Sequence, residues 1–267
     1  MESTELLGYF GALIVGLVLG LIGGGGSILT VPILVYFLGL NPVVATAYSL
    51  FVVGTTSLFG SLQNLRKRMV DVKTAVIFAI PSFIAVYATR RWIVPAIPEE
   101  LFSVSNFMVT KNIFIMVLFA IIMLLASLSM IFSKSNVNED PNQSIDYNYP
   151  LIAIEGAVVG VLTGLVGAGG GFLIIPALVL LAKLPMKKAV GTSLLIVTVK
   201  SLIGFLGDIQ LLTIDWNFLL LFTSISIVGI LLGVYLSKFI PGKKLKKGFG
   251  WFTLIMAFYI LYKELFS

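Results

Sequence analysis

Two glycine-rich segments contain the residues of this chain best suited to bind a ligand. They read GLIGGGGSILTVP at residues 20–32 and GLVGAGGGFLIIP at residues 164–176. Glycine lets backbone N–H groups approach a ligand closely, and the short helix expected after each segment points its positive N-terminal end at the same place. The expected ligand is therefore an anion. The predicted binding residues are Gly23, Gly24, Gly25, Gly26 and Ser27 in the first segment, and Gly167, Gly169, Gly170 and Gly171 in the second.

Close helix packing is the alternative interpretation of these glycines, because small residues let membrane helices approach each other. We assign that role to the glycines that precede the two runs, namely Gly16, Gly20, Gly156, Gly160 and Gly164. Four near-consecutive glycines exceed what packing needs, which favours binding at the runs themselves. A Rossmann phosphate loop is excluded, because no strand is expected before the glycines and no βαβ unit after them.

A polar face on the next apolar segment of each half supplies further candidates. The first set is Ser49, Thr56, Gly60 and Asn64, and the second, 144 positions later, is Ser193, Lys200, Gly204 and Asp208. Residues at these spacings share one side of a helix. A cation as deep in an apolar segment as Lys200 costs about 2.5–3.5 kcal/mol on insertion scales. It therefore provides charge for an anion or pairs with a carboxylate of another helix. The alternative is a lysine that snorkels to the interface, which its central position disfavours. We add Ser49, Thr56, Thr192, Ser193 and Lys200 to the predicted site.

Other charged residues receive weaker interpretations. Asn64 and Asp208 are left open between a helix-end or interface role and a place in the site. Glu155, near the start of its segment, is interpreted as interfacial. Arg90 and Arg91 either attract anions to an outer vestibule or anchor lipid headgroups, and the anchoring role is favoured. The lysine cluster at 243–247 is interpreted as a topology determinant and lipid contact.

The composition identifies a membrane protein. Hydrophobic residues make up 58% of the chain and charged residues 11%, whereas soluble domains carry about 25% charged residues. Apolar stretches recur throughout without the alternation of barrel strands. The chain has no cysteine and no histidine, which removes thiol catalysis, imidazole proton relays and the usual zinc sites. We therefore predict an all-α polytopic membrane protein that is not an enzyme, with no cofactor, no metal and no nucleic-acid partner.

The chain divides into two similar halves within one transmembrane domain. Repeat one covers residues 5–132, a polar linker covers 133–149, and repeat two covers 150–266. Each half holds five apolar pieces. The pieces at 27–39 and 171–183 are too short to cross a bilayer, so a re-entrant arrangement is expected. In total we expect about 8–10 membrane segments.

Loop charges predict that the two repeats have inverted topology. The basic loop residues are Arg66, Lys67, Arg68 and Lys73 in repeat one, and Lys183, Lys187, Lys188, Lys238, Lys243, Lys244, Lys246 and Lys247 in repeat two. Equivalent loops carry opposite biases, because the loop equivalent to 64–73 holds Asp208 and Asp215 but no Lys or Arg. Under the positive-inside rule, equivalent loops then lie on opposite sides of the membrane. Arg90 and Arg91 are an exception that this arrangement places outside.

The two glycine segments, with the phrases that follow them, resemble the sulfite exporter TauE/SafE family. The phrases are ATAYSL at 45–50 and AVGTSL at 189–194, each after a proline-marked turn. The resemblance covers essentially the whole chain and implies an integral inner-membrane protein of about eight helices. It also implies transport of small organosulfur or sulfur-oxide anions, typically outward. Related thiosulfate-uptake proteins depend on cysteines, which this chain lacks. Ser27 stands where repeat two has Gly171, which places a hydroxyl in the predicted site.

The combined prediction is a secondary transporter of the cytoplasmic membrane that moves a small anion by alternating access. Sulfite or an organosulfonate is the first choice of substrate, and export is the expected direction. An anion channel of the same fold is the nearest alternative. A membrane enzyme or a non-transporting subunit is the alternative from another class, but no histidine, cysteine or paired intramembrane carboxylate is available for catalysis. The expected partners are the bilayer and the anion, and assembly into a homo-oligomer is left open.

Overall fold

The computed structural model describes residues 3–23, 26–104, 107–132, 149–167, 169–180 and 184–266. The predicted linker at 133–149 lies outside this part of the chain except for Tyr149. Gly24 and Gly25 of the predicted site also lie outside it, as do Ala168 and Lys183.

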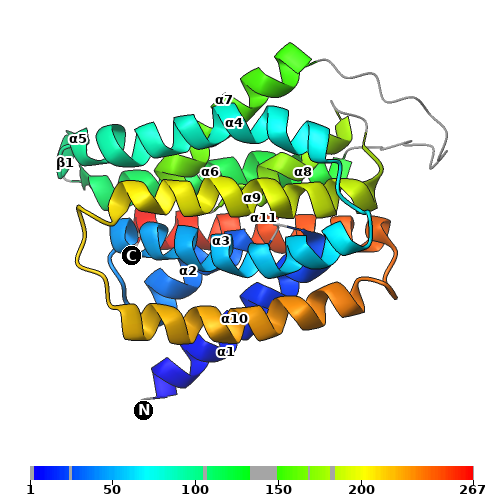
Figure 1. Ribbon diagram of the computed structural model, residues 1–267. Helices are drawn as coiled ribbons and strands as arrows, with labels where there is room; N and C mark the ends of the chain where they lie inside the picture. The colour runs from blue at the N-terminus through cyan, green and yellow to red at the C-terminus, as the bar shows by residue number, and fades with distance from the viewer. Residues whose placement is uncertain are drawn as a thin grey trace.

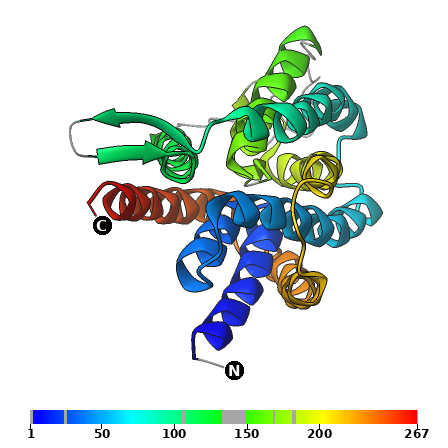
Figure 2. The same ribbon diagram turned by 90° about the vertical axis from the view of Figure 1, so that its left-hand side faces the viewer.

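The described residues form a bundle of helices with one small β-hairpin (Figure 1). The long helices are α1 (Ser3–Ile22), α3 (Pro42–Arg66), α4 (Val72–Ala88), α6 (Lys111–Phe132), α7 (Tyr149–Val166), α9 (Met186–Asp208), α10 (Trp216–Leu236) and α11 (Gly242–Phe266). The short elements are α2 (Ser27–Pro32), η1 (Ile33–Phe37), η2 (Thr89–Ile93), α5 (Val94–Ala96), β1 (Glu100–Val104), β2 (Phe107–Thr110) and α8 (Gly171–Leu180). The hairpin projects to the side of the bundle beside α6 (Figure 2), and the sequence did not predict it.

Six helices within the described residues are long and apolar enough to cross a membrane. They are α3, α4 with its extension to Ala96, α6, α7, α9 and α10. Shorter apolar helices cover Leu7–Ile22 and Ser27–Phe37. The chain is therefore an all-α polytopic membrane protein, as the composition predicted. The prediction of 8–10 membrane segments also counted the short apolar pieces at 27–39 and 171–183, which are not among these six helices.

Local sequence signals explain where the main helices begin. Pro42 opens α3, and the side chain of Asn41 accepts a hydrogen bond from the Val43 N–H, which satisfies one of the free donors of a first helical turn. Asp71 caps α4 through the Thr74 N–H, and Asp215 caps α10 through the Phe218 N–H. Asp71 and Asp215 are themselves 144 positions apart, so equivalent helices begin with equivalent caps.

The two halves of the chain pack into each other. Helix α1 packs along α10, and α7 packs along α4, so each contact joins one half to the other. Helices α3 and α9 cross each other, as do α6 and α11. The colours of Figure 1 run in opposite directions along α3 and α9, so these equivalent helices are antiparallel.

Glycines allow the close approach of α1 to α10 and of α7 to α4. A Cβ on Gly16 would overlap the Ser226 carbonyl oxygen, and a Cβ on Gly160 would overlap the Ser82 carbonyl oxygen. Ser82 and Ser226 are again 144 positions apart. Gly20, Gly156 and Gly164 meet the same two helices. The predicted packing role of these glycines is confirmed.

Replacing Gly16 by alanine should therefore destabilise the protein. The added methyl group forces α1 away from α10, and overpacking of this kind costs about 1–3 kcal/mol. The measurement is the free energy of unfolding in detergent micelles titrated with sodium dodecyl sulfate. Gly248→Ala is the matched control, because no atom lies within 4 Å of its Cβ position. Equal unfolding curves for the two variants would contradict the packing role.

Candidate functional site

Each glycine segment breaks its helix at an equivalent residue. Gly23 ends α1 and Gly167 ends α7, both with φ of +69°, a conformation that favours glycine. The Gly23 N–H donates to the Leu19 carbonyl and the Gly167 N–H to the Thr163 carbonyl, each over 2.8 Å. The two helices therefore end with the same geometry, whereas Gly26 and its equivalent Gly170 differ, with φ of −67° and +64°.

Each break lies against the first turns of the long helix of the other half. Gly23 contacts Val190 of α9, and Gly167 contacts Thr46 of α3. Val190 and Thr46 are equivalent positions. The Ser193 hydroxyl lies within hydrogen-bond distance of the Gly23 carbonyl and of the Val190 carbonyl, the latter at 2.8 Å, so its O–H can donate to either. The structure thus brings two predicted site residues, Gly23 and Ser193, into contact.

The second glycine segment lies between α3 and α9. A Cβ on Gly169 would lie 2.6 Å from Val53 Cγ1 of α3 and 3.3 Å from Ser201 Oγ of α9. A Cβ on Gly170 would lie 2.5 Å from Lys200 Nζ. Both glycines have positive φ, at +62° and +64°. Any side chain at these two positions would therefore displace the polar groups that face the broken backbone.

Lys200 places a buried amino group beside this segment. The residue is 1% exposed, and its Nζ lies 3.2 Å from Thr163 Oγ1. Among the described residues, no carboxylate lies within ion-pair distance of Lys200. Pairing with a carboxylate of another helix, one of the predicted roles of Lys200, finds no partner in this part of the chain. Its predicted role of providing charge for an anion stays a prediction.

The other predicted hydroxyl residues are buried on α3, α9 and the short helix α2. Ser49 Oγ and Thr56 Oγ1 are buried and have no hydrogen-bond partner within the described chain. Ser27 is buried in the first turn of α2, while Gly26 and Gly171 are buried where α2 and α8 begin. Thr192 Oγ1 accepts the Asp71 N–H over 2.9 Å, so its hydroxyl supports the α3–α4 connection. Its predicted contact with an anion stays a prediction.

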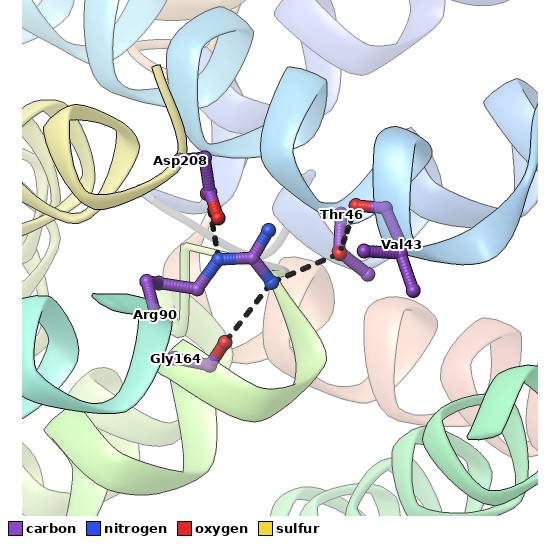
Figure 3. Close-up of polar contacts among 5 residues, drawn as sticks. All are labelled: Val43, Thr46, Arg90, Gly164 and Asp208. Atoms are coloured by element: carbon purple, nitrogen blue, oxygen red, sulfur yellow. Dashed lines mark hydrogen bonds and ion pairs between the residues drawn. The ribbon is translucent and has the colours of Figure 1, made fainter. Parts of the chain in front are cut away.

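Arg90 is fully buried, and its predicted role as a headgroup anchor is wrong. Its Nε lies 2.6 Å from Asp208 Oδ2, and its Nη1 donates to Thr46 Oγ1 over 3.0 Å and to the Gly164 carbonyl over 3.3 Å (Figure 3). This network joins η2, α9, α3 and α7 at one point. A buried guanidinium requires such partners because desolvation of its charge is costly. Arg91 is half-buried, and its anchoring role stays a prediction.

Sequence reasoning missed Arg90 and Thr46 for an identifiable reason. Arg90 and Asp208 are 118 residues apart, so no helical spacing links them. The available signal was one basic and one acidic residue near the ends of apolar segments, a pattern that can reflect a buried pair. Asn64, whose role was also left open, donates to the Gly60 carbonyl over 2.9 Å and lines a cavity.

Two cavities lie at opposite ends of the α3–α9 pair. The one at the start of α3, here called the Arg90 cavity, has a volume of about 400 Å³. Its polar lining consists of Asn41, Arg90, Glu99, Lys111, Asn112 and Asp208. The one at the end of α3, here called the lysine cavity, has a volume of about 220 Å³. Its polar lining consists of Asn64, Lys67, Lys187, Ser237 and Lys238.

The two cavities occupy equivalent places but differ in charge. Asn64 and Val234 of the lysine cavity correspond to Asp208 and Arg90. None of the described residues that line the lysine cavity is acidic. Partial burial, and then the nearby Lys238 ammonium, lower the pKa of Lys67 below its ordinary value. An anion in the lysine cavity would relieve this repulsion.

The apolar helices form a multi-pass membrane protein, and comparison with known proteins identifies it as a membrane transporter. The family model described as sulfite exporter TauE/SafE matches residues 9–260. A probable membrane transporter protein of Xylella fastidiosa (strain 9a5c) is 28% identical over 255 residues, covering 94% of this chain and 92% of the relative. The probable membrane transporter protein YunE of Bacillus subtilis (strain 168) is 30% identical over 271 residues, covering 96% of each chain. No solved structure matches. The chain belongs to the sulfite exporter TauE/SafE family.

Thr46→Val should lower the free energy of unfolding by about 1.5–3 kcal/mol, because it removes a hydrogen bond to a buried charged group. Valine fits the shape of the site, since Val190 occupies the equivalent place. Thr223→Val is the control, because the Thr223 hydroxyl bonds only the Leu219 carbonyl of its own helix among the described residues. Unfolding in mixed micelles is the measurement. If both variants lowered the free energy of unfolding by the same small amount, the Thr46–Arg90 hydrogen bond would not stabilise the fold.

Proposed function

We propose that this transporter exports a small anion, sulfite or an organosulfonate first, across the cytoplasmic membrane by alternating access. The observation that carries the proposal is the position of Lys200, whose buried amino group faces the broken backbone at Gly170. Backbone that leaves the helix inside a membrane persists only where protein encloses it or it lines a cavity. A cation beside such a break, close to the start of a helix, favours an anionic ligand.

Buried hydroxyl groups near the crossing of α3 and α9 complete the proposed site. Ser201 Oγ faces Gly169, and Ser49 and Thr56 lie on α3 with unpartnered hydroxyls in the described chain. Such groups can donate to anion oxygens, which would satisfy hydrogen-bonding capacity that is otherwise costly to bury. Sulfite is the choice of substrate because the family is described as sulfite exporters. An organosulfonate presents similar oxygens to the same donors.

The lysine cavity supports loading from the cytoplasm. It contains Lys67, Lys187 and Lys238 at one end of the α3–α9 pair, and the positive-inside rule assigns this end to the cytoplasm. A cavity lined by one sign of charge raises the local concentration of ions of the opposite sign. The Arg90 cavity would then face outward. Two equivalent cavities at opposite ends of one helix pair suit a site that opens to each side in turn.

Lys200→Met should reduce anion transport at least about tenfold, the factor that one charge-assisted hydrogen bond contributes. Uptake of labelled sulfite, sulfoacetate, sulfate and chloride into proteoliposomes is the measurement. Lys200→Arg should retain more activity than Lys200→Met because it keeps the charge. Lys188→Gln is the control, since this exposed lysine lies outside both cavities. Parent rates for Lys200→Met on every anion would refute the proposed site.

The inverted topology predicts that Lys67→Cys and Thr213→Cys react with a membrane-impermeant maleimide from opposite sides of the membrane. The natural chain has no cysteine, so each variant carries one label site. Thr213 is exposed and lies in the α9–α10 connection, where Asp215 is unsuitable because it caps α10. Labelling is compared in intact spheroplasts and in inside-out vesicles. Reaction of both cysteines from the same side would exclude inverted repeats.

A further inference from the structure

We propose that the Arg90 cavity is a second anion-binding site, in which the Arg90 guanidinium is the main ligand for a small organic oxyanion. The sequence favoured headgroup anchoring by Arg90 over attraction of anions to an outer vestibule, and the proposed central site does not use this residue. The inference rests on the proposed function only for the order of transport steps. Binding at Arg90 stands on the geometry of the cavity itself.

The first argument comes from the hydrogen bonds of the guanidinium. Arginine carries five N–H donors on three nitrogens. Nε and Nη1 bond Asp208, Thr46 and the Gly164 carbonyl. Nη2 is fully buried and has no partner within the described chain, and it carries no dashed line in Figure 3. One edge of the group is thus held in place, and the other retains two donors. An oxyanion is the acceptor that such a donor binds most strongly.

The second argument comes from the charges around the cavity. Asp208 compensates the Arg90 charge through Nε, so the buried cation is tolerated before any anion binds. Lys111 lines the same cavity and is 6% exposed. Its Nζ lies 3.7 Å from Glu99 Oε1, but the Glu99 side chain is 82% exposed, so water screens that carboxylate. Lys111 therefore provides a second positive group for an anion.

The shape and lining of the cavity indicate the chemical class. A volume of about 400 Å³ lies within the range of about 300–1,000 Å³ that holds small organic ligands. The apolar lining residues are Val43, Val44, Val94, Pro95, Leu211 and Leu212. These would contact the carbon chain of an anion whose charged group meets Arg90. Short organosulfonates and carboxylates fit this combination, and a phospholipid headgroup shares only its charge.

Arg90 also lies between the cavity and the second glycine segment. It bonds Thr46, which contacts Gly167, and it bonds the carbonyl of Gly164 in the last turn of α7. An anion bound at Arg90 is therefore separated from the Lys200 region by few residues. If Lys200 marks the central site, Arg90 holds the anion at the next position toward the Arg90 cavity. The lysine cavity has no such pair, because Val234 and Asn64 replace Arg90 and Asp208 there.

A single cysteine placed in the cavity tests this proposal. Asn112 lines the cavity and is half-buried, so Asn112→Cys is introduced into the full cysteine-free chain in phosphatidylcholine nanodiscs. The thiol is allowed to react with 2-sulfonatoethyl methanethiosulfonate or with its 2-(trimethylammonium)ethyl analogue. The rate ratio is the reaction rate of the sulfonate reagent divided by that of the cationic reagent. We expect this rate ratio to be at least about tenfold higher in the parent than in a variant without Arg90, because one charge-assisted hydrogen bond contributes that factor. Methanesulfonate should slow the reaction by competition.

The matched variant is Arg90→Gln with Asp208→Asn, which removes both charges and leaves no unpaired buried ion. Lys111→Gln provides a milder change and should reduce the rate ratio less. Gel filtration confirms folding, and Lys111→Gln alone decides the test if the double variant does not fold. The proposal is overturned if the rate ratio is the same in parent and folded variants, or if methanesulfonate gives no protection. Phosphatidylglycerol is then added to the nanodiscs, and protection by this lipid but not by methanesulfonate would also overturn the proposal.

Lys200→Met separates this proposal from the proposed function. With Asn112→Cys it should retain protection by methanesulfonate, because the two sites use different cations. If Lys200→Met kept both the protection of the introduced thiol by methanesulfonate and the parent transport rates, the central site would be refuted and the Arg90 site supported. If Lys200→Met lost transport and methanesulfonate gave no protection, the Arg90 site alone would be refuted.

Discussion

Backbone that leaves the helix inside an apolar bundle must be enclosed by protein, and the rest of this structure depends on that constraint. The chain meets the constraint twice, and the two helices end in the same way. Gly23 and Gly167 end their helices at positive φ, and each lies on the first turns of the long helix from the other half. The halves must therefore interlock. Helices α3 and α9 form the centre because both breaks pack against them.

The two buried cations beside this centre are stabilised differently. Arg90 has a carboxylate, a hydroxyl and a carbonyl around it, and it joins four elements. Lys200 has a hydroxyl and the glycine backbone, without a carboxylate among the described residues. Because a buried charge is costly unless it is compensated, the proposed anion would compensate the Lys200 charge more than the Arg90 charge. Arg90 combines structural bonds with donors that remain available.

Much of the fold and part of the site could be predicted from the sequence. Composition identified the membrane class, and the repeated glycine segments located both helix breaks. Periodicity placed Lys200 and Ser193 on one face, and the structure brings each to a glycine segment. Periodicity could not find Thr46 or Thr163, because an isolated threonine in an apolar segment satisfies its hydroxyl within its own helix equally well. It also misassigned Arg90, whose carboxylate lies in the other half of the chain.

The sequence by itself determined which backbone breaks and which residues repeat, because glycine conformation and helical spacing are local properties. The tertiary structure decided which partners those residues meet. Asp208 pairs with Arg90 rather than with Lys200 of its own helix, since the crossing of α9 with α4 and η2 brings the guanidinium to the helix end. Contacts between distant segments set the electrostatic environment of each charge, and these contacts cannot be predicted from local sequence.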